Sequence, residues 1–268
     1  MFFRRRKPPT IAHAPPIARR VTELSAGEFV AERAGYADDP ELTRFRMARE
    51  AAFRAATDLR AFKNPALDRL IDTVDAAGRP CHVLDIDGAL GSFGAALIAQ
   101  RGNMVASFTV LELPEIVAGA RALGEGAAHF IDRLDDIPAR PDIVFTSGTL
   151  QYFDEPFDLV RTILDLAAPA VILARTFLAE DRPRYFRQDS PMFDHGAGPI
   201  PPGFENRLVA SYAQAVPWPA LRAAITRDYA ITRGAANDSG VIVAADDLFG
   251  FDLVLRRLNP GDPHNAPS

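Results

Sequence analysis

The sequence predicts an α/β domain built on a doubly wound, mostly parallel sheet. From residue 80 onward, short apolar runs alternate with amphipathic helical segments. A glycine-containing loop follows the first of these runs, and an acidic residue ends the second. Such alternation is typical of parallel strands that are joined by helices and covered on both faces. Right-handed crossovers then bring the carboxyl ends of the strands, where ligands bind, to one edge of the sheet.

Hydrophobic periodicity predicts the individual elements. Two helices, at 41–62 and 65–77, precede the sheet, and Gly78 ends the second of them. We expect seven strands, at 82–86, 106–112, 127–131, 142–146, 170–174, 229–233 and 251–257. Further helices are predicted at 92–100, from Pro114, at 156–166 and at 220–226. Prolines and glycines interrupt 177–216, so we expect an irregular insertion there that covers the strand ends as a lid.

These elements form one domain over residues 21–258, with a helical extension at 21–78 and the sheet-containing core at 79–258. Residues 1–20 and 259–268 are expected to be disordered tails. The first tail begins with two phenylalanines and a basic cluster at 4–7, which allows a weak contact with an anionic membrane surface. It has the features of neither a signal peptide nor a membrane span.

Composition narrows the class of function. Hydrophobic residues make up 48% of the chain and charged residues 24%, as in ordinary globular proteins. A net charge of -5 gives no support to strong binding of nucleic acid. The single cysteine, Cys81, precedes an apolar strand, so we expect a buried, inert thiol in a reducing, cytoplasmic compartment. No histidine or cysteine spacing indicates a metal site, and none is predicted.

The tips of the first three strands indicate a cofactor site. Small residues in the loop Asp85–Gly91 let the backbone approach a ligand, and the following helix N-terminus suits an anionic group. Glu112, at the next tip, can accept hydrogen bonds from both hydroxyls of a ribose. Asp132, at the third, is either an acceptor for an adenine amino group or a turn and cap residue.

The loop also discriminates between cofactors. It reads DIDGALG rather than the G-x-G-x-x-G of dinucleotide-binding enzymes, and the chain has no Tyr-x-x-x-Lys pair. These two features disfavour a nicotinamide cofactor. An acidic residue that opens the loop, Asp85, favours S-adenosylmethionine.

Three stretches carry a resemblance to a known family: VLDIDGALGSFG at 83–94, LELPEIVAGAR at 111–121 and DIVFTSGTLQYFDEP at 142–156. Over about residues 80–258 the chain resembles bacterial class I S-adenosylmethionine-dependent methyltransferases of the type found in surface-glycan loci. The run Ser147–Tyr152 is the most distinctive part of that likeness. The resemblance implies a Rossmann-like seven-stranded sheet and methyl transfer to a small-molecule or glycan-type acceptor in polysaccharide biosynthesis. Together with the strand tips, it implies that the cofactor contacts Asp85, Asp87, Gly88, Ala89, Gly91, Glu112, Leu113, Asp132, Ser147 and Gly148.

Several residues are candidates for the transfer itself. Gln151 and Tyr152 follow the fourth strand, near the expected methyl group, although Tyr152 also suits a core or lid position. Arg175, at the end of the fifth strand, either binds an acidic acceptor by a bidentate contact or forms a structural ion pair. His195 is either a base or a solvated loop residue. Ser147 and Gly148 also have a purely structural interpretation, as a turn.

The chain departs from the family where Asp87 and Ala89 replace glycines and where Ala213–Trp218 follows Ser211-Tyr212. Ala89 is a mild change if its φ is negative. Asp87 either pairs with the cofactor's ammonium or opposes its carboxylate, and we expect the second, so that Asp87→Gly tightens binding. These departures leave an alternative open, a non-catalytic or regulatory protein with a degenerate methyltransferase fold.

Overall fold

The computed structural model describes residues 18–33, 39–122, 124, 126, 128–196, 198–237 and 247–258. The expectations for the C-terminal tail, for residues 1–17 and for membrane contact lie outside these residues. The domain itself begins within the tail predicted at 1–20, because Arg20 opens the first strand, β1 (Arg20–Leu24).

Seven strands form the predicted sheet, in the order β4-β3-β2-β5-β6-β10-β9. Pairing is parallel from β4 through β6, whereas β10 runs antiparallel to both of its neighbours. The strands are β2 (Cys81–Ile86), β3 (Val105–Leu111), β4 (His129–Ile131), β5 (Ile143–Ser147), β6 (Ala170–Ala179), β9 (Tyr229–Ala236) and β10 (Leu248–Arg257). The sequence therefore predicted this part of the sheet correctly, although β6 is longer than expected.

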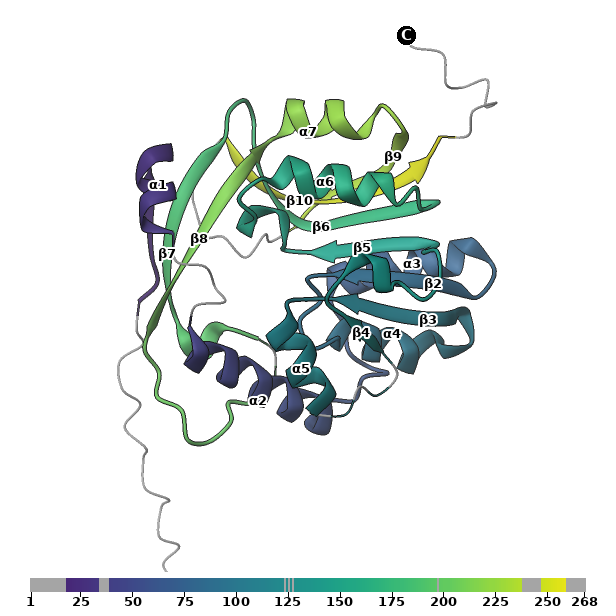
Figure 1. Cartoon of the computed structure of the whole chain (residues 1–268), viewed down its shortest axis with the longest axis horizontal. Coiled ribbons are helices and arrows are strands. Elements are labelled where there is room, and N and C mark those ends of the chain that lie inside the picture. The colour runs from purple at the N-terminus through teal and green to yellow at the C-terminus, as the bar shows by residue number, and fades with distance from the viewer. Residues whose placement is uncertain are drawn as a thin grey trace, which may run out of the picture.

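The prediction of seven strands is nevertheless wrong for the whole sheet, which has ten in the described residues. Residues 177–216 are not an irregular insertion, because they contain β7 (Arg184–Pro191) and β8 (Leu208–Pro217). These two strands pair with each other antiparallel, β1 adds to β7, and β8 joins the end of β6. Figure 1 shows this extension on the left, rising away from the parallel strands.

Polar residues on the inward face explain why β7 was missed. Phe186, Gln188 and Ser190 alternate as buried positions along it, so only one of the three is apolar. The proline and glycine content that predicted irregular structure belongs mainly to the connection at 192–207 and to the strand ends. A strand that faces a polar cavity rather than an apolar core lacks the alternation by which strands are recognised.

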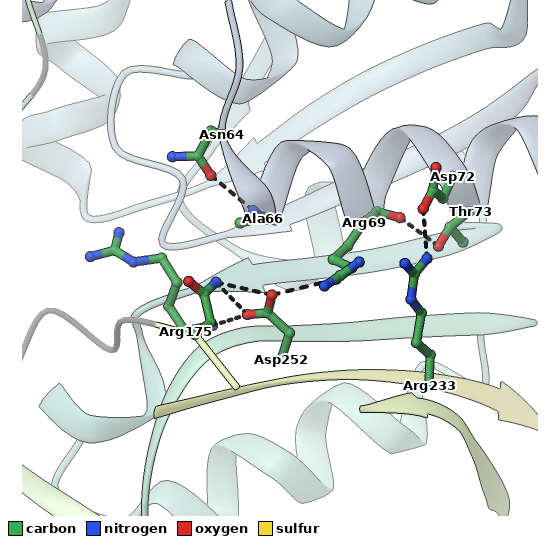
Figure 2. Close-up of polar contacts among 9 residues, drawn as sticks. Asn64, Ala66, Arg69, Asp72, Thr73, Arg175, Arg233 and Asp252 are labelled. Atoms are coloured by element: carbon green, nitrogen blue, oxygen red, sulfur yellow. Dashed lines mark hydrogen bonds and ion pairs between the residues drawn. The ribbon is translucent and has the colours of Figure 1, made fainter. Parts of the chain in front are cut away.

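Seven α-helices accompany the strands in the described residues: α1 (Ala26–Glu32), α2 (Pro40–Ala56), α3 (Pro65–Ala77), α4 (Ser92–Arg101), α5 (Pro114–Ala122), α6 (Pro156–Asp165) and α7 (Trp218–Ile225). The bounds predicted for α3 are confirmed, with Asn64 capping the amide of Ala66 at 2.9 Å (Figure 2) and Gly78 at φ 67° ending the helix. None of these helices is long and apolar enough to cross a membrane.

The prediction that α2 extends to residue 62 is wrong, because the helix ends at Ala56 and Thr57 is extended. The Asp58 side chain accepts a hydrogen bond from the amide of Arg60 at 3.1 Å, a local turn that competes with helix. Phe62 nevertheless packs edge-on against Phe53, with ring centroids 5.1 Å apart. The apolar periodicity therefore continued past the helix because both segments contact the same core.

Helices cover both faces of the parallel strands, as a doubly wound fold requires. One core includes Leu70 of α3, Leu97 of α4 and Phe145 of β5. The opposite core includes Val144 of β5, Ile163 of α6 and Leu221 of α7. Adjacent residues of β5 thus point into different cores, which matches its uninterrupted apolar sequence.

Gly94 provides a test of this packing. A Cβ at Gly94, within α4, would lie 2.5 Å from the ring of Phe108 on β3. Gly94→Ala should therefore lower the free energy of unfolding by about 1–3 kcal/mol through overpacking, although alanine favours helix. The control is Gly102→Ala, because a Cβ there meets only Ile98, at 3.8 Å, in a helical conformation. Denaturant unfolding measures both, and a Gly94→Ala protein as stable as the original would contradict the close packing of α4 on β3.

Candidate functional site

A cavity of about 1250 Å³ lies at the carboxyl ends of the parallel strands. Its opposite walls come from α2, β7 and the segment after β7. Of the residues predicted from the sequence, those that line it are Asp85, Asp87, Gly88, Ala89, Glu112, Leu113, Asp132, Ser147, Gly148, Tyr152, Arg175 and His195. Gly91 and Gln151 are not among the lining residues. The fold thus gathers residues from the ends of β2, β3, β4 and β5, and Arg175 from within β6, around one space.

The loop after β2 is built on left-handed backbone. Asp87 has φ 61°, Ala89 φ 49° and Gly91 φ 78°. Ala89 is therefore not the mild change expected for a negative φ, because an L-residue there carries a cost of about 1–2 kcal/mol. Gly88 has a different constraint, since a Cβ would lie 2.4 Å from Oδ2 of Asp85. Internal packing against Asp85 thus requires glycine at position 88.

Glu112 joins this loop to the tip of β3. Its Oε1 accepts the amide hydrogen of Ala89 at 2.7 Å, and its Oε2 accepts that of Leu113 at 2.9 Å. The side chain is 9% exposed. Burial, with the nearby charge of Asp87, raises the pKa of Glu112 to about 8. The residue therefore stands where it was predicted, as an acceptor that is already oriented by two backbone groups.

Two further carboxyl groups crowd this corner. Asp85 is 1% exposed, its Oδ2 has no hydrogen-bond partner in the described structure, and burial followed by repulsion from Asp87 and Glu112 raises its pKa well above the usual value. Asp87 is open to the cavity but otherwise surrounded by protein, and this desolvation raises its pKa against the opposing charge of Arg46. Asp87 also shares a hydrogen bond with Glu112. Glu112 therefore holds a proton near neutral pH.

The next strand tip presents Asp132 and, across from it, Leu113. Asp132 is exposed and borders the cavity. The short 3-10 helix that follows it (Leu134–Asp136) begins at Arg133 without a side-chain cap, so the structure gives Asp132 no capping role there. Leu113 is 48% exposed, which leaves an apolar surface beside Glu112.

The tip of β5 leads into a 3-10 turn (Leu150–Tyr152). Gly148 has φ 73° and donates its amide hydrogen to the carbonyl of Ala174, so the turn interpretation is correct for Gly148, whereas Ser147 is the last residue of β5. Both residues also line the cavity. Tyr152 likewise combines both interpretations, because it lines the cavity and packs on the cluster around Phe177 and Phe186. Gln151 is fully buried beneath the cavity, where its Nε2 donates to the carbonyl of Arg175 at 3.2 Å.

Arg175 does not end the fifth predicted strand, because β6 continues to Ala179. It lies at a bulge, where Ala174 and Arg175 face the single residue Asp252 of β10, and it has φ 53°. Figure 2 shows its guanidinium directed away from Asp252, which instead accepts the Arg175 amide hydrogen at 2.8 Å and pairs with Arg69 at 3.5 Å. The buried carboxylate of Asp252 therefore binds the backbone amide of Arg175 and not its guanidinium.

The expectation of a solvated His195 is wrong. The residue is 9% exposed and shares a hydrogen bond of 2.9 Å between its Nε2 and Oγ of Ser190. Burial, with the positive charge of Arg46, lowers the pKa of His195 to about 4. Arg49 of α2 fixes the segment by donating to the carbonyls of His195 and Gly198. His195 is thus a neutral imidazole in the cavity wall.

Sequence reasoning missed the wall opposite the strand ends. Its polar lining residues are Arg19, Arg33, Arg46, Glu50, Gln188, Ser190 and Asp194. Arg46 and Glu50 are one helical turn apart on α2, so they share a face, but polar residues on an amphipathic helix are ordinarily solvated. No signal in the sequence distinguished this pair from the other charged residues of α2.

No protein-family model matches the chain, and no curated protein matches it either. Solved structures do. The CcbJ methyltransferase from Streptomyces caelestis has 15% sequence identity and a TM-score of 0.51, with 80% of this chain and 98% of that chain covered. An S-adenosylmethionine-dependent methyltransferase from Clostridium acetobutylicum has 9% identity and a TM-score of 0.49, with 80% and 97% covered. A Burkholderia thailandensis 1,6-didemethyltoxoflavin-N1-methyltransferase has 17% identity and a TM-score of 0.47, with 92% of this chain and 100% of that chain covered. The similarity to the CcbJ structure shows that the chain has a methyltransferase-like α/β fold.

Proposed function

We propose that the chain transfers a methyl group from S-adenosylmethionine to an oxygen or nitrogen of a small-molecule or glycan-type acceptor. The observation that carries this proposal is the Glu112 carboxylate, buried at the tip of β3 and oriented by the amides of Ala89 and Leu113. That arrangement presents an acceptor for ribose hydroxyls beside a loop whose backbone is open to the cavity. The fold supplies the same context, because ligands of such sheets bind at the carboxyl ends of the strands.

The residues present fit this cofactor. Its sulfonium and ammonium are cationic, and the corner where Asp85, Asp87 and Glu112 meet is acidic. The unpartnered Oδ2 of Asp85 is a buried acceptor of the kind that a ligand donor satisfies. Glu112 would hold the ribose, Asp132 the adenine amino group, and Leu113 one face of the ring. When bound, the cofactor supplies a methyl group activated for in-line displacement.

The remaining lining residues suit an acceptor. Tyr152 and Arg175 border the cavity from the sheet, while Ser190 and His195 border it from the opposite wall. A protonated oxygen or nitrogen nucleophile needs a proton acceptor, and His195, being neutral, can serve as one. The likeness of Ser147–Tyr152 to methyltransferases from glycan loci is the reason for including a glycan-type acceptor.

Cys81, a free and buried thiol, agrees with a cytoplasmic location.

One observation favours a second candidate, a non-catalytic protein with a degenerate site. Asp87 and Ala89 both adopt left-handed backbone where glycine is favoured, and Asp87 places a carboxyl group against Glu112. Calorimetric titration with S-adenosylhomocysteine separates the candidates. Binding supports the methyltransferase, whereas no binding to the native protein across pH 6–9 would support the non-catalytic protein with a degenerate site.

Glu112→Ala should weaken S-adenosylhomocysteine binding by about 1–3 kcal/mol, because the ribose hydroxyls lose a buried acceptor. The matched control is Glu115→Ala, which removes an exposed carboxylate three residues further along, in the first turn of α5. Its affinity should equal that of the native protein. An equal loss in both variants would indicate a general electrostatic effect and would remove the ribose assignment.

Cofactor affinity should rise with pH. Because the pKa of Glu112 is raised to about 8, its carboxyl group is protonated at pH 6 in the free protein. Ligand groups that donate hydrogen bonds or carry positive charge favour the ionised form, so binding releases a proton and strengthens as pH increases toward 8. One coupled proton gives at most about a tenfold change in affinity per pH unit.

The substitution Asp87→Asn should move that rise to lower pH, since it removes the like charge that helps to raise the pKa of Glu112. Asparagine also tolerates the left-handed backbone of position 87. Calorimetry at pH 6, 7 and 8 measures the shift. Asp87→Gly in the same series should tighten binding if Asp87 opposes the cofactor's carboxylate, and weaken it if Asp87 pairs with the ammonium. Affinity that is flat with pH in the native protein would show that Glu112 does not change its ionisation on binding.

A further inference from the structure

Arg175 is held in a backbone conformation that an arginine does not favour. Its φ of 53° lies in the left-handed region, in the middle of a strand. The bulge opposite Asp252 is the local cause, because two residues of β6 occupy the space of one. Bulges of this kind change the direction in which a side chain points. Strained backbone persists only where the surrounding structure enforces it, and it concentrates at functional sites.

Buried polar groups enforce this conformation from both sides of the residue. The carboxylate of Asp252, 1% exposed, accepts the Arg175 amide hydrogen at 2.8 Å. The fully buried Gln151 donates to the Arg175 carbonyl at 3.2 Å. Asp252 is in turn held by Asn237, whose Nδ2 donates at 2.8 and 2.9 Å, and by Arg69 at 3.5 Å. Asp252 and Gln151 thus hold the two backbone polar groups of Arg175, and Arg69 and Asn237 hold Asp252 in turn. Figure 2 shows Arg69, Asp252 and Arg175 in this arrangement.

The result of this arrangement is the placement of the guanidinium. A Cβ at Gly148 would lie 3.6 Å from Nη1 of Arg175, so the guanidinium lies over the tip of β5. The hydroxyl of Ser147, beside Gly148, is buried and makes no hydrogen bond within the described part of the chain. Both residues line the cavity. The guanidinium offers several hydrogen-bond donors in a fixed fork, which is the complement of an oxyanion.

We propose that Arg175 forms a subsite, at the tip of β5 beside Ser147 and Gly148, for a carboxylate or phosphate group of the methyl acceptor, with Asp252 and Gln151 as positioning residues. This inference rests on the proposed methyltransferase function and names its substrate class. The acidic corner around Glu112 takes the cationic part of the cofactor. The guanidinium at the tip of β5 takes the anionic group of the acceptor and orients its nucleophile in the same cavity.

The test measures anion binding and stability in the same variants. Benzoate, inorganic phosphate and the neutral analogue benzamide are titrated into the full-length protein, with and without saturating S-adenosylhomocysteine. We expect the native protein to bind at least one anion more tightly than benzamide, and the preferred anion distinguishes a carboxylate from a phosphate acceptor. Arg175→Gly should weaken that binding by about tenfold or more, the effect of losing a charged hydrogen-bond partner. Arg175→Lys keeps the charge without the bidentate geometry, so its loss should be smaller.

Stability separates this role from a structural ion pair. Glycine adopts a φ of 53° without strain, so Arg175→Gly should leave Tm unchanged or raise it. The matched control is Ala167→Gly, which relieves the same φ of 53° outside the cavity and should leave anion binding unchanged. A lower Tm for Arg175→Gly, with Tm maintained in the control, would show that the guanidinium is structural and would overturn the proposal.

Other outcomes are equally decisive. Native protein that binds neither anion better than benzamide has no such subsite. Weaker S-adenosylhomocysteine binding by Arg175→Gly would assign the residue to the cofactor instead of the acceptor. If S-adenosylhomocysteine does not bind the native protein at all, the proposed function fails, whereas the anion titrations without it still decide whether the subsite exists.

Discussion

The carboxylate of Glu112 is the contact on which the geometry of the site depends. It accepts amide hydrogens from Ala89, in the loop after β2, and from Leu113, at the start of the next connection. The two strand tips are therefore held at a defined separation by one buried side chain. A loop with left-handed residues at 87, 89 and 91 has little intrinsic preference for this shape, so an external acceptor for its amides is what maintains it.

The cost of this arrangement is electrostatic. Three carboxyl groups, Asp85, Asp87 and Glu112, share a poorly solvated corner, and their pKa values are all raised. Arg46 from α2 offsets part of the repulsion at Asp87 and Glu112. The same positive charge helps to keep His195 neutral on the opposite wall. One arginine of α2 thus links the protonation of the two sides of the cavity, because all of these groups lie in a region of low dielectric response.

The extension formed by β1, β7 and β8 explains how a parallel sheet acquires a second wall opposite its strand ends. In an open sheet, the carboxyl ends of the strands face solvent. Here β8 pairs in parallel with the last residues of β6, and β7, paired with β8, brings Gln188 and Ser190 to the cavity. The connection beyond β7 is held to α2 by Arg49. The wall is therefore regular, hydrogen-bonded structure, in place of the irregular lid that the proline content suggested.

The sequence by itself determined the parallel strands, the helices between them and the positions of Asp85, Glu112, Asp132 and Ser147 at strand tips. These features follow from local periodicity and from the chirality of the crossovers, both of which a single chain displays. Tertiary structure alone decided the environment of those residues. The burial of His195, the bulge that aims Arg175, and the entry of Arg46 from α2 all arise between segments distant in sequence. A side chain's solvation and charge depend on every group packed around it, and such neighbours leave no periodic signal in the chain.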